Sequence, residues 1–231
     1  MDVIGPNHAA CGVAAYGGSV WAGTHLLGFG RLGVAQATLG AVVALGASLA
    51  PDLDEPHSMA GHANPLAHLG VFGGHRRRTH CLVAVAVVAA AAVVCGGSRA
   101  ATAGLVGLAA CTGGGVLSRA LRGGGWLLCV PFGVAVGWAC YRFVPGGWWL
   151  SAAVSLPYAS HLVGDGLTPG GVPWLLPFSQ RRWSLSLFRT GRAVELLLVT
   201  PAVHLLAGWA VYAAFAPTVT ATVAGTAGAV R

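Results

Sequence analysis

Residues 81–118 read CLVAVAVVAAAAVVCGGSRAATAGLVGLAACTGGGVLS and hold a single charged side chain, that of Arg99. The Gly-Gly-Ser-Arg sequence at 96–99 divides this stretch into two apolar segments. Each has about the length of a membrane-spanning helix, which needs roughly 17–25 mostly apolar residues. Further apolar segments lie on both sides, and the full set covers 9–29, 34–50, 81–97, 100–118, 126–144, 148–162 and 194–215.

These segments predict an all-α fold, a polytopic bundle of transmembrane helices. The segments 34–50, 81–97 and 148–162 are short, so we expect about five to seven of the segments to cross the bilayer. Residues 1–216 then form a single membrane-embedded helical domain. Residues 217–231 are rich in Ala, Gly and Thr, and we expect them to form a flexible C-terminal tail.

The composition excludes most other classes of protein. Hydrophobic residues make up 55% of the 231 residues and charged residues 8%, against about 25% charged in an ordinary soluble domain. The mean hydropathy is +0.71. A water-soluble enzyme, a disordered chain and a basic nucleic-acid-binding domain are therefore excluded. The net charge of +7 fits the basic loops of a membrane protein, so we expect no nucleic-acid partner.

The arginine distribution predicts the orientation, because cytoplasmic loops of membrane proteins are enriched in basic residues. With the N-terminus in the cytoplasm and all the segments spanning, most of the basic residues fall inside, namely Arg76, Arg77, Arg78, Arg119, Arg122, Arg181, Arg182, Arg189 and Arg192. The same topology delivers His and Asp residues from four separate segments to the cytoplasmic face. We therefore expect a polar site at that face.

Two short motifs supply candidate metal ligands at the ends of predicted spans. Asp52 and Asp54 follow Pro51, which should end or kink the helix before them. His161 and Asp165 are four residues apart, so on a helix they share a face and can hold one cation. Ionisable groups at membrane depth are costly and usually functional. A helix-ending polar turn and an interfacial capping pair remain the structural alternatives.

A third motif, HRRRTH at 75–80, places His75 and His80 on either side of three arginines. A turn must bring the two imidazoles together, and imidazole is the commonest metal ligand in proteins. His8 precedes the first segment and is a further candidate ligand. For the arginines alone, a basic loop that sets membrane topology is the favoured explanation.

Four blocks of the sequence resemble a known family: Asn7-His8, PDLDEPHS at 51–58, GHRRRTHC at 74–81 and SHLVGDGLTPGGVPWLLPFSQRR at 160–182. They resemble the YdjM-like family of bacterial inner-membrane, metal-dependent hydrolases. The resemblance implies hydrolase activity in the inner membrane. It also implies a metal site whose polar positions are His8, Asp52, Asp54, His75, His80, His161 and Asp165.

We therefore predict a membrane-bound, metal-dependent hydrolase with a cytoplasmic active face. Seven candidate ligands exceed the four that one zinc ion takes, so we expect two divalent ions, zinc foremost and Mn or Mg as alternatives. A metal-activated water attacks the substrate, and Asp54 accepts the proton. Guanidinium groups match phosphate, so we expect a phosphoester or lipid-linked substrate from the membrane to contact Arg76, Arg77, Arg78, Arg181 and Arg182.

Two other functions fit the same residues. A metal or proton transporter would carry ionisable groups at several depths, and here only His25 and His204 lie deeper in the predicted spans. A non-catalytic membrane protein with a structural metal would have a closed set of ligands. The arginines would then serve topology and attraction to anionic lipid.

Overall fold

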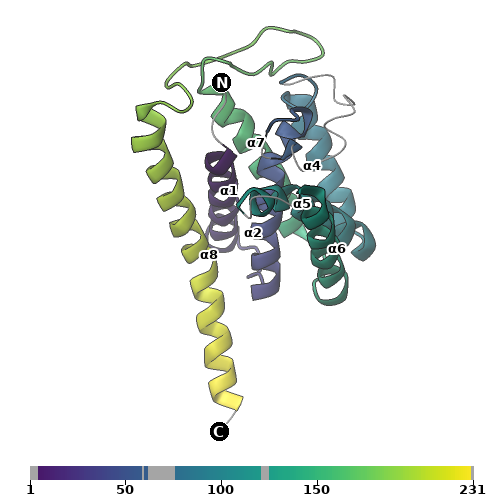
Figure 1. Cartoon of the computed structure of the whole chain (residues 1–231). Helices are drawn as coiled ribbons and strands as arrows, with labels where there is room; N and C mark the ends of the chain where they lie inside the picture. Colours follow the sequence, from purple (N-terminus) through teal and green to yellow (C-terminus); the bar gives the residue numbers. More distant parts are fainter. Residues whose placement is uncertain (1–4, 59, 62–75, 121–124, 230–231) are drawn as a thin grey trace.

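The chain is all-α. The computed structural model describes residues 5–58, 60–61, 76–120 and 125–229, and this part holds seven α-helices (Figure 1). They are α1 (Gly5–His25), α2 (Val34–Leu49), α4 (Leu82–Gly96), α5 (Arg99–Ala120), α6 (Gly125–Phe143), α7 (Trp148–Gly166) and α8 (Thr200–Ala229). A 3-10 helix, η1 (Ala50–Asp54), continues α2, and a π-helical turn, η3 (Glu195–Val199), leads into α8. The all-α class is confirmed for the described residues, and each predicted apolar segment lies wholly or mostly in a helix.

Helix α7 lies at the centre of the bundle and packs against α1, α2 and α4. Helices α5 and α6 form a hairpin that joins the bundle mainly through α2, whereas α8 packs along α1 as a long outer helix (Figure 1). The polar side chains at the C-terminal end of α7 are therefore surrounded by the ends of several other elements.

Small residues let the helices approach closely. A Cβ atom on Gly46 of α2 would overlap the carbonyl group of Ala109 in α5, and one on Gly107 of α5 would lie 2.8 Å from the carbonyl oxygen of Gly133 in α6. Glycine at these positions allows backbone-to-backbone contact, which is the usual way that helices associate in lipid. The high glycine content of the sequence thus serves helix packing.

Large apolar side chains cover the outside of the bundle. Val94 on α4 is 76% exposed, and Leu205 on α8 is 75% exposed. In the described part, two helical stretches are long and apolar enough to cross a membrane, 34–54 and 195–216. The apolar stretches of α4 and α6 are shorter. The prediction of five to seven spans stays a prediction.

The C-terminal helix is longer than the sequence suggested. We predicted a last span ending near residue 215 and a flexible tail after it, but α8 continues past Pro217 to Ala229. The many alanines of this stretch favour the helical state. Helical structure therefore includes most of the residues assigned to the tail.

An irregular segment connects α7 to the π-helical turn and runs over the end of the bundle that holds the start of α1 (Figure 1). An antiparallel β-bridge between Val172 and Trp183 closes it into a clip. Backbone hydrogen bonds from Leu185 to Gly166 and from Leu187 to Leu167 fix the clip to the last turn of α7. This segment forms the outer wall of the site.

Candidate metal centre

Most of the predicted ligands come together from four segments at one end of the bundle. His8 lies in the first turn of α1, Asp52 and Asp54 lie in η1, and His80 lies in the turn before α4. His161 and Asp165 project from the last turns of α7. All six residues are buried. His75, the seventh predicted ligand, lies outside the described residues.

Pro51 explains how two acidic residues of η1 reach the interior. Helix α2 ends at Leu49, and the chain continues as a 3-10 helix with Pro51 in its first turn. Proline lacks the N–H that an α-helix would need at this position, so the chain tightens there instead of continuing straight. The predicted break is confirmed. The turn directs Asp52 toward α7 and leaves Asp54 beside the loop before α4.

Four donor atoms form a compact set. The Nε2 atom of His161 lies 3.3 Å from Oδ1 of Asp52 and 3.5 Å from Oδ2 of Asp165. The Nε2 atom of His80 lies 3.6 Å and 3.4 Å from the same two oxygens. Two ligands each about 2.1 Å from a tetrahedral zinc ion are about 3.4 Å apart. The distances from each imidazole nitrogen to both carboxylate oxygens therefore fit ligands that share one tetrahedral cation.

The same contacts are poor hydrogen bonds, whose donor–acceptor distances run from about 2.7 to 3.2 Å. The Nε2 atom of His161, Oδ1 of Asp52 and Oδ2 of Asp165 are buried and have no hydrogen-bond partner. Buried polar atoms without partners are rare because each costs about 1–3 kcal/mol. A shared cation would satisfy all of them, so the residues present fit a divalent metal ion.

The charges at the site also favour a cation. Three buried carboxylates and one buried guanidinium, that of Arg76, meet at this end of the bundle. With the imidazoles neutral, the group carries a net charge of −2. A buried charge of this size is expensive unless it is compensated. A proton on His80 compensates part of it in the metal-free protein, and a divalent ion that displaces this proton compensates all of it.

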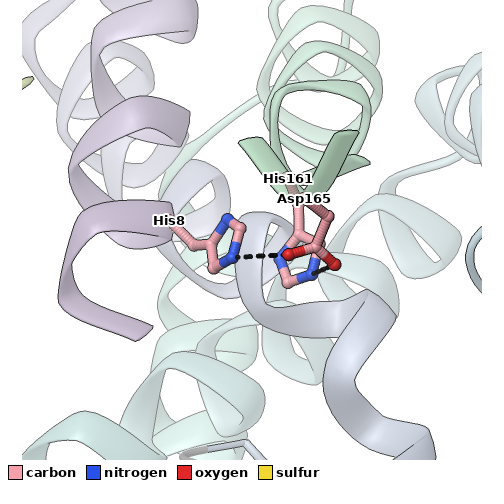
Figure 2. Close-up of side chains that lie close together, drawn as sticks. All are labelled: His8, His161 and Asp165. Atoms are coloured by element: carbon pink, nitrogen blue, oxygen red, sulfur yellow. Dashed lines mark ion pairs between the residues drawn. The ribbon is translucent and has the colours of Figure 1, made fainter. Parts of the chain in front are cut away.

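His8 extends the set on one side (Figure 2). Its Nε2 atom lies 3.4 Å from Oδ1 of Asp165, and its ring stacks on that of His161 with centroids 3.7 Å apart. Two groups of residues could each hold an ion: His8, His161 and Asp165, and Asp52, His80 and His161. Both use His161, whose single Nε2 lone pair binds one ion at a time.

A family model described as YdjM inner membrane protein matches residues 1–121 and 125–230. The chain belongs to the YdjM inner membrane protein family. Membership confirms the resemblance seen in the four sequence blocks. No curated protein and no solved structure matches the chain significantly.

Neighbouring groups orient two of the imidazoles in this YdjM protein. The carbonyl oxygen of Ser48 accepts a hydrogen bond of 2.6 Å from Nδ1 of His161, which leaves Nε2 with its lone pair toward the centre. On the other side, Thr79 donates a hydrogen bond of 2.6 Å to Oδ2 of Asp54, and this oxygen lies 3.5 Å from Nδ1 of His80. Asp54 therefore lies at the Nδ1 side of the His80 ring, whereas Nε2 faces Asp52 and Asp165.

This position changes the interpretation of Asp54. We predicted a ligand and the proton acceptor, and both roles stay predictions; Asp54 lies outside the two groups that could hold an ion. A carboxylate behind a ligating histidine fixes the ring and raises its basicity. Burial lowers the pKa of His80, but the carboxylates of Asp165, Asp52 and Asp54 outweigh it and raise that pKa to about 9.

Arg76 is part of the centre. Its side chain is 2% exposed, and its guanidinium lies 2.6 Å from Oδ1 of Asp165 and donates a hydrogen bond to the carbonyl of Gly171. Its backbone has a φ of 55°, a left-handed conformation that non-glycine residues rarely adopt and that often marks functional sites. A side chain at Gly170 would overlap the guanidinium, so glycine there makes room for it.

The predicted substrate arginines gather beside the centre. Arg76, Arg77, Arg78 and Arg182, with Pro173 and Gln180, line a pocket of about 250 Å³ that we call the arginine pocket. The side chains of Arg77, Arg78 and Arg182 are exposed, whereas the buried guanidinium of Arg76 connects the pocket to Asp165. Arg181 instead stacks over Trp183 with its guanidinium carbon 4.7 Å from the ring centroid.

One buried acid was given no role by the sequence. Glu195 is fully buried in the π-helical turn and accepts hydrogen bonds from the side chain of Asn7, at 2.9 Å, and from the backbone of Gly191. Asn7 directly precedes His8, so this contact anchors the start of α1 to α8. The available signal was an isolated acid at the start of an apolar segment, which is rarely placed without a function.

Proposed function

We propose that this YdjM protein is a membrane-bound hydrolase that uses a buried divalent cation held by Asp52, His80, His161 and Asp165. The observation that carries the proposal is that each of the two buried imidazole nitrogens lies 3.3–3.6 Å from both carboxylate oxygens, too far for good hydrogen bonds and suited to a shared ion. Two nitrogens and two oxygens in this arrangement favour zinc. The arginine distribution supports a cytoplasmic location for the site.

A bound divalent cation supplies Lewis acidity, which lowers the pKa of water toward neutrality and so provides a nucleophile for hydrolysis. The residues of the chain hold and orient the imidazoles that would bind the cation. The backbone of Ser48 fixes the ring of His161, and Asp54 with Thr79 fixes that of His80. The side chain of Asp52 is 11% exposed, whereas those of His80 and His161 are 0% exposed, so water reaches the site most readily beside Asp52.

The arginine pocket supports a phosphate ester as the substrate. Its guanidinium groups can pair with phosphate oxygens in a bidentate manner. Arg76 extends from this pocket to Asp165, so a phosphate bound among the arginines lies next to the cation site. The substrate contacts predicted for Arg77, Arg78 and Arg182 are kept in this proposal, whereas Arg181 lies against Trp183.

The proposal is tested with purified protein in detergent and soluble phosphodiester and phosphomonoester probes. We expect hydrolysis that stops when a chelator is added and returns with zinc, manganese or magnesium. Asp165→Asn should be inactive, whereas Glu55→Gln, which changes a carboxylate outside the ligand set, should keep the wild-type rate. No hydrolysis by metal-loaded protein, or activity that survives complete metal removal, would contradict the proposal.

A structural metal is the second candidate, because four protein ligands around one ion make a closed set of the kind that structural zinc sites use. The hydrolase requires the ion to accept water as a fifth ligand, as catalytic zinc sites can. It predicts that the chelator lowers the melting temperature and that no substrate is hydrolysed. The transporter alternative would need a path of ionisable groups. Among the described residues the groups that could hold an ion lie at one end of the bundle, which favours the hydrolase.

A further inference from the structure

A second pocket lies on the other side of the clip that covers the site. Val163, Gly166 and Leu167 of the α7 end, with Trp174, Trp183 and Leu185 of the clip, line a cavity of about 280 Å³ that we call the tryptophan pocket. The remaining lining residue is Ser184, whose hydroxyl donates a hydrogen bond to the carbonyl of Thr168, so the lining is otherwise apolar or aromatic. Val163 is 53% exposed and Leu185 is 69% exposed, so the pocket opens on the apolar outer surface of the bundle.

The two pockets share one backbone. At the bridge between Val172 and Trp183 the chain is paired in an antiparallel manner. Beside this bridge Pro173 and Arg182 line the arginine pocket, whereas the residues that follow them, Trp174 and Trp183, line the tryptophan pocket. The clip thus separates a cationic pocket from an apolar one by the thickness of a single chain.

The cationic and apolar pockets lie side by side in the same way as the polar head and apolar chain of an amphiphile at a membrane surface. The arginine pocket adjoins the candidate metal centre through Arg76, and the tryptophan pocket lies against the last turn of α7, which carries Asp165. Tryptophan is typical of the boundary between headgroups and hydrocarbon. A phosphate alone leaves the apolar pocket unused, and a neutral hydrocarbon makes no use of the exposed arginines Arg77, Arg78 and Arg182.

We propose that the substrate is a phosphate-bearing lipid, with its phosphate in the arginine pocket and one hydrocarbon chain in the tryptophan pocket. The description of this lipid as a substrate rests on the proposed hydrolase function. The binding site itself is independent of it. The clip between Val172 and Trp183 then acts as the element that selects a molecule with both a phosphate and a chain.

Binding is measured on the full-length protein in detergent by native mass spectrometry, with phosphatidic acid, diacylglycerol and glycerol phosphate as probes. Val163→Trp fills the tryptophan pocket, and Val87→Trp makes the same change on the exposed face of α4 as a control. Arg182→Gln removes a pocket cation, and Arg99→Gln removes an exposed arginine elsewhere. The metal content of each variant is recorded in parallel.

We expect phosphatidic acid to bind at least about tenfold more tightly than either diacylglycerol or glycerol phosphate. Val163→Trp should weaken phosphatidic acid about tenfold and leave glycerol phosphate unchanged, whereas Arg182→Gln should weaken both. The control variants and all metal contents should match the wild type. Equal binding of diacylglycerol, or an unaltered affinity in Val163→Trp, would overturn the lipid site.

The two proposals fail in different ways. Hydrolysis of soluble phosphoesters without selective binding of phosphatidic acid removes the lipid site and keeps the hydrolase. Selective binding of phosphatidic acid by a protein that hydrolyses no phosphoester keeps the lipid site and removes the hydrolase.

Discussion

The end of α7 and the α5–α6 hairpin are built on opposite principles. Around α7, buried side chains from four segments meet, and their donor atoms are spaced for a cation. The hairpin has no His, Asp or Glu in residues 99–143, and its helices touch through the backbones of Gly107 and Gly133. The comparison teaches that this chain separates packing from chemistry: small residues hold the helices together, and polar residues are concentrated where one function needs them.

The largest effect should come from removing a ligand at the α7 end. We expect His161→Ala to lose the bound metal, with affinity lower by more than about 100-fold, the upper end of what the loss of a supporting group costs. The matched change His204→Ala affects an exposed imidazole that bonds the carbonyl of Thr200 within its own helix. It should keep the full metal content. Elemental analysis of both purified proteins decides, and equal metal contents would refute the assignment of His161.

The pH dependence of metal affinity should be nearly as large. The pKa of His80 is raised to about 9, so below that pH its imidazole is protonated in the metal-free protein and a cation must displace the proton. Apparent affinity should therefore rise about tenfold per pH unit between about pH 7 and 9 and level off above. Calorimetry in two buffers of different ionisation enthalpy measures the released proton. A flat affinity over this range would contradict the location of His80 among three carboxylates.

A smaller effect is expected for Asp54, which lies behind His80. Asp54→Asn should weaken metal binding by about 10–100-fold, as the loss of an orienting group usually does, while the metal still binds when supplied in excess. Glu55→Gln is the control, since the side chain of Glu55 lies outside the ligand set and accepts a hydrogen bond from the backbone of His57. If Asp54→Asn abolished binding as fully as His161→Ala, Asp54 would be a ligand, as we first predicted from the sequence.

The smallest effect on the site should come from the hairpin. Gly107→Val places atoms against the carbonyl of Gly133 and should destabilise the protein by about 1–3 kcal/mol through overpacking. Gly104→Val, on the same helix with open space around it, should be nearly neutral. Both variants should bind metal within a few-fold of the wild type. Thermal unfolding and metal titration test this pair, and a large loss of metal affinity in Gly107→Val would show that packing and chemistry are coupled.

Sequence reasoning succeeded where a local pattern determines the result. Apolar length predicted every helix, Pro51 predicted the end of α2, and the four-residue spacing of His161 and Asp165 predicted their shared direction. Each of these depends on neighbours along the chain. The rules of helix periodicity and proline geometry are sufficient for them.

Sequence reasoning failed where contacts between distant segments determine the position of a side chain. Which of Asp52 and Asp54 reaches α7 depends on how the 3-10 turn packs against the loop before α4. The inward turn of Arg76 requires a left-handed backbone and the empty space at Gly170. The contact of Asn7 with Glu195 joins the two ends of the chain. None of these is encoded in the spacing of residues.

The most direct test of the metal centre is the X-ray absorption spectrum of the zinc-loaded protein. The structure predicts only nitrogen and oxygen neighbours at about 2.0–2.1 Å, with the outer scattering of about two imidazole rings. His161→Ala should lose this signal, and His204→Ala should keep it. Sulfur neighbours at about 2.3 Å, or an ion surrounded by water without imidazole, would contradict a site made of Asp52, His80, His161 and Asp165.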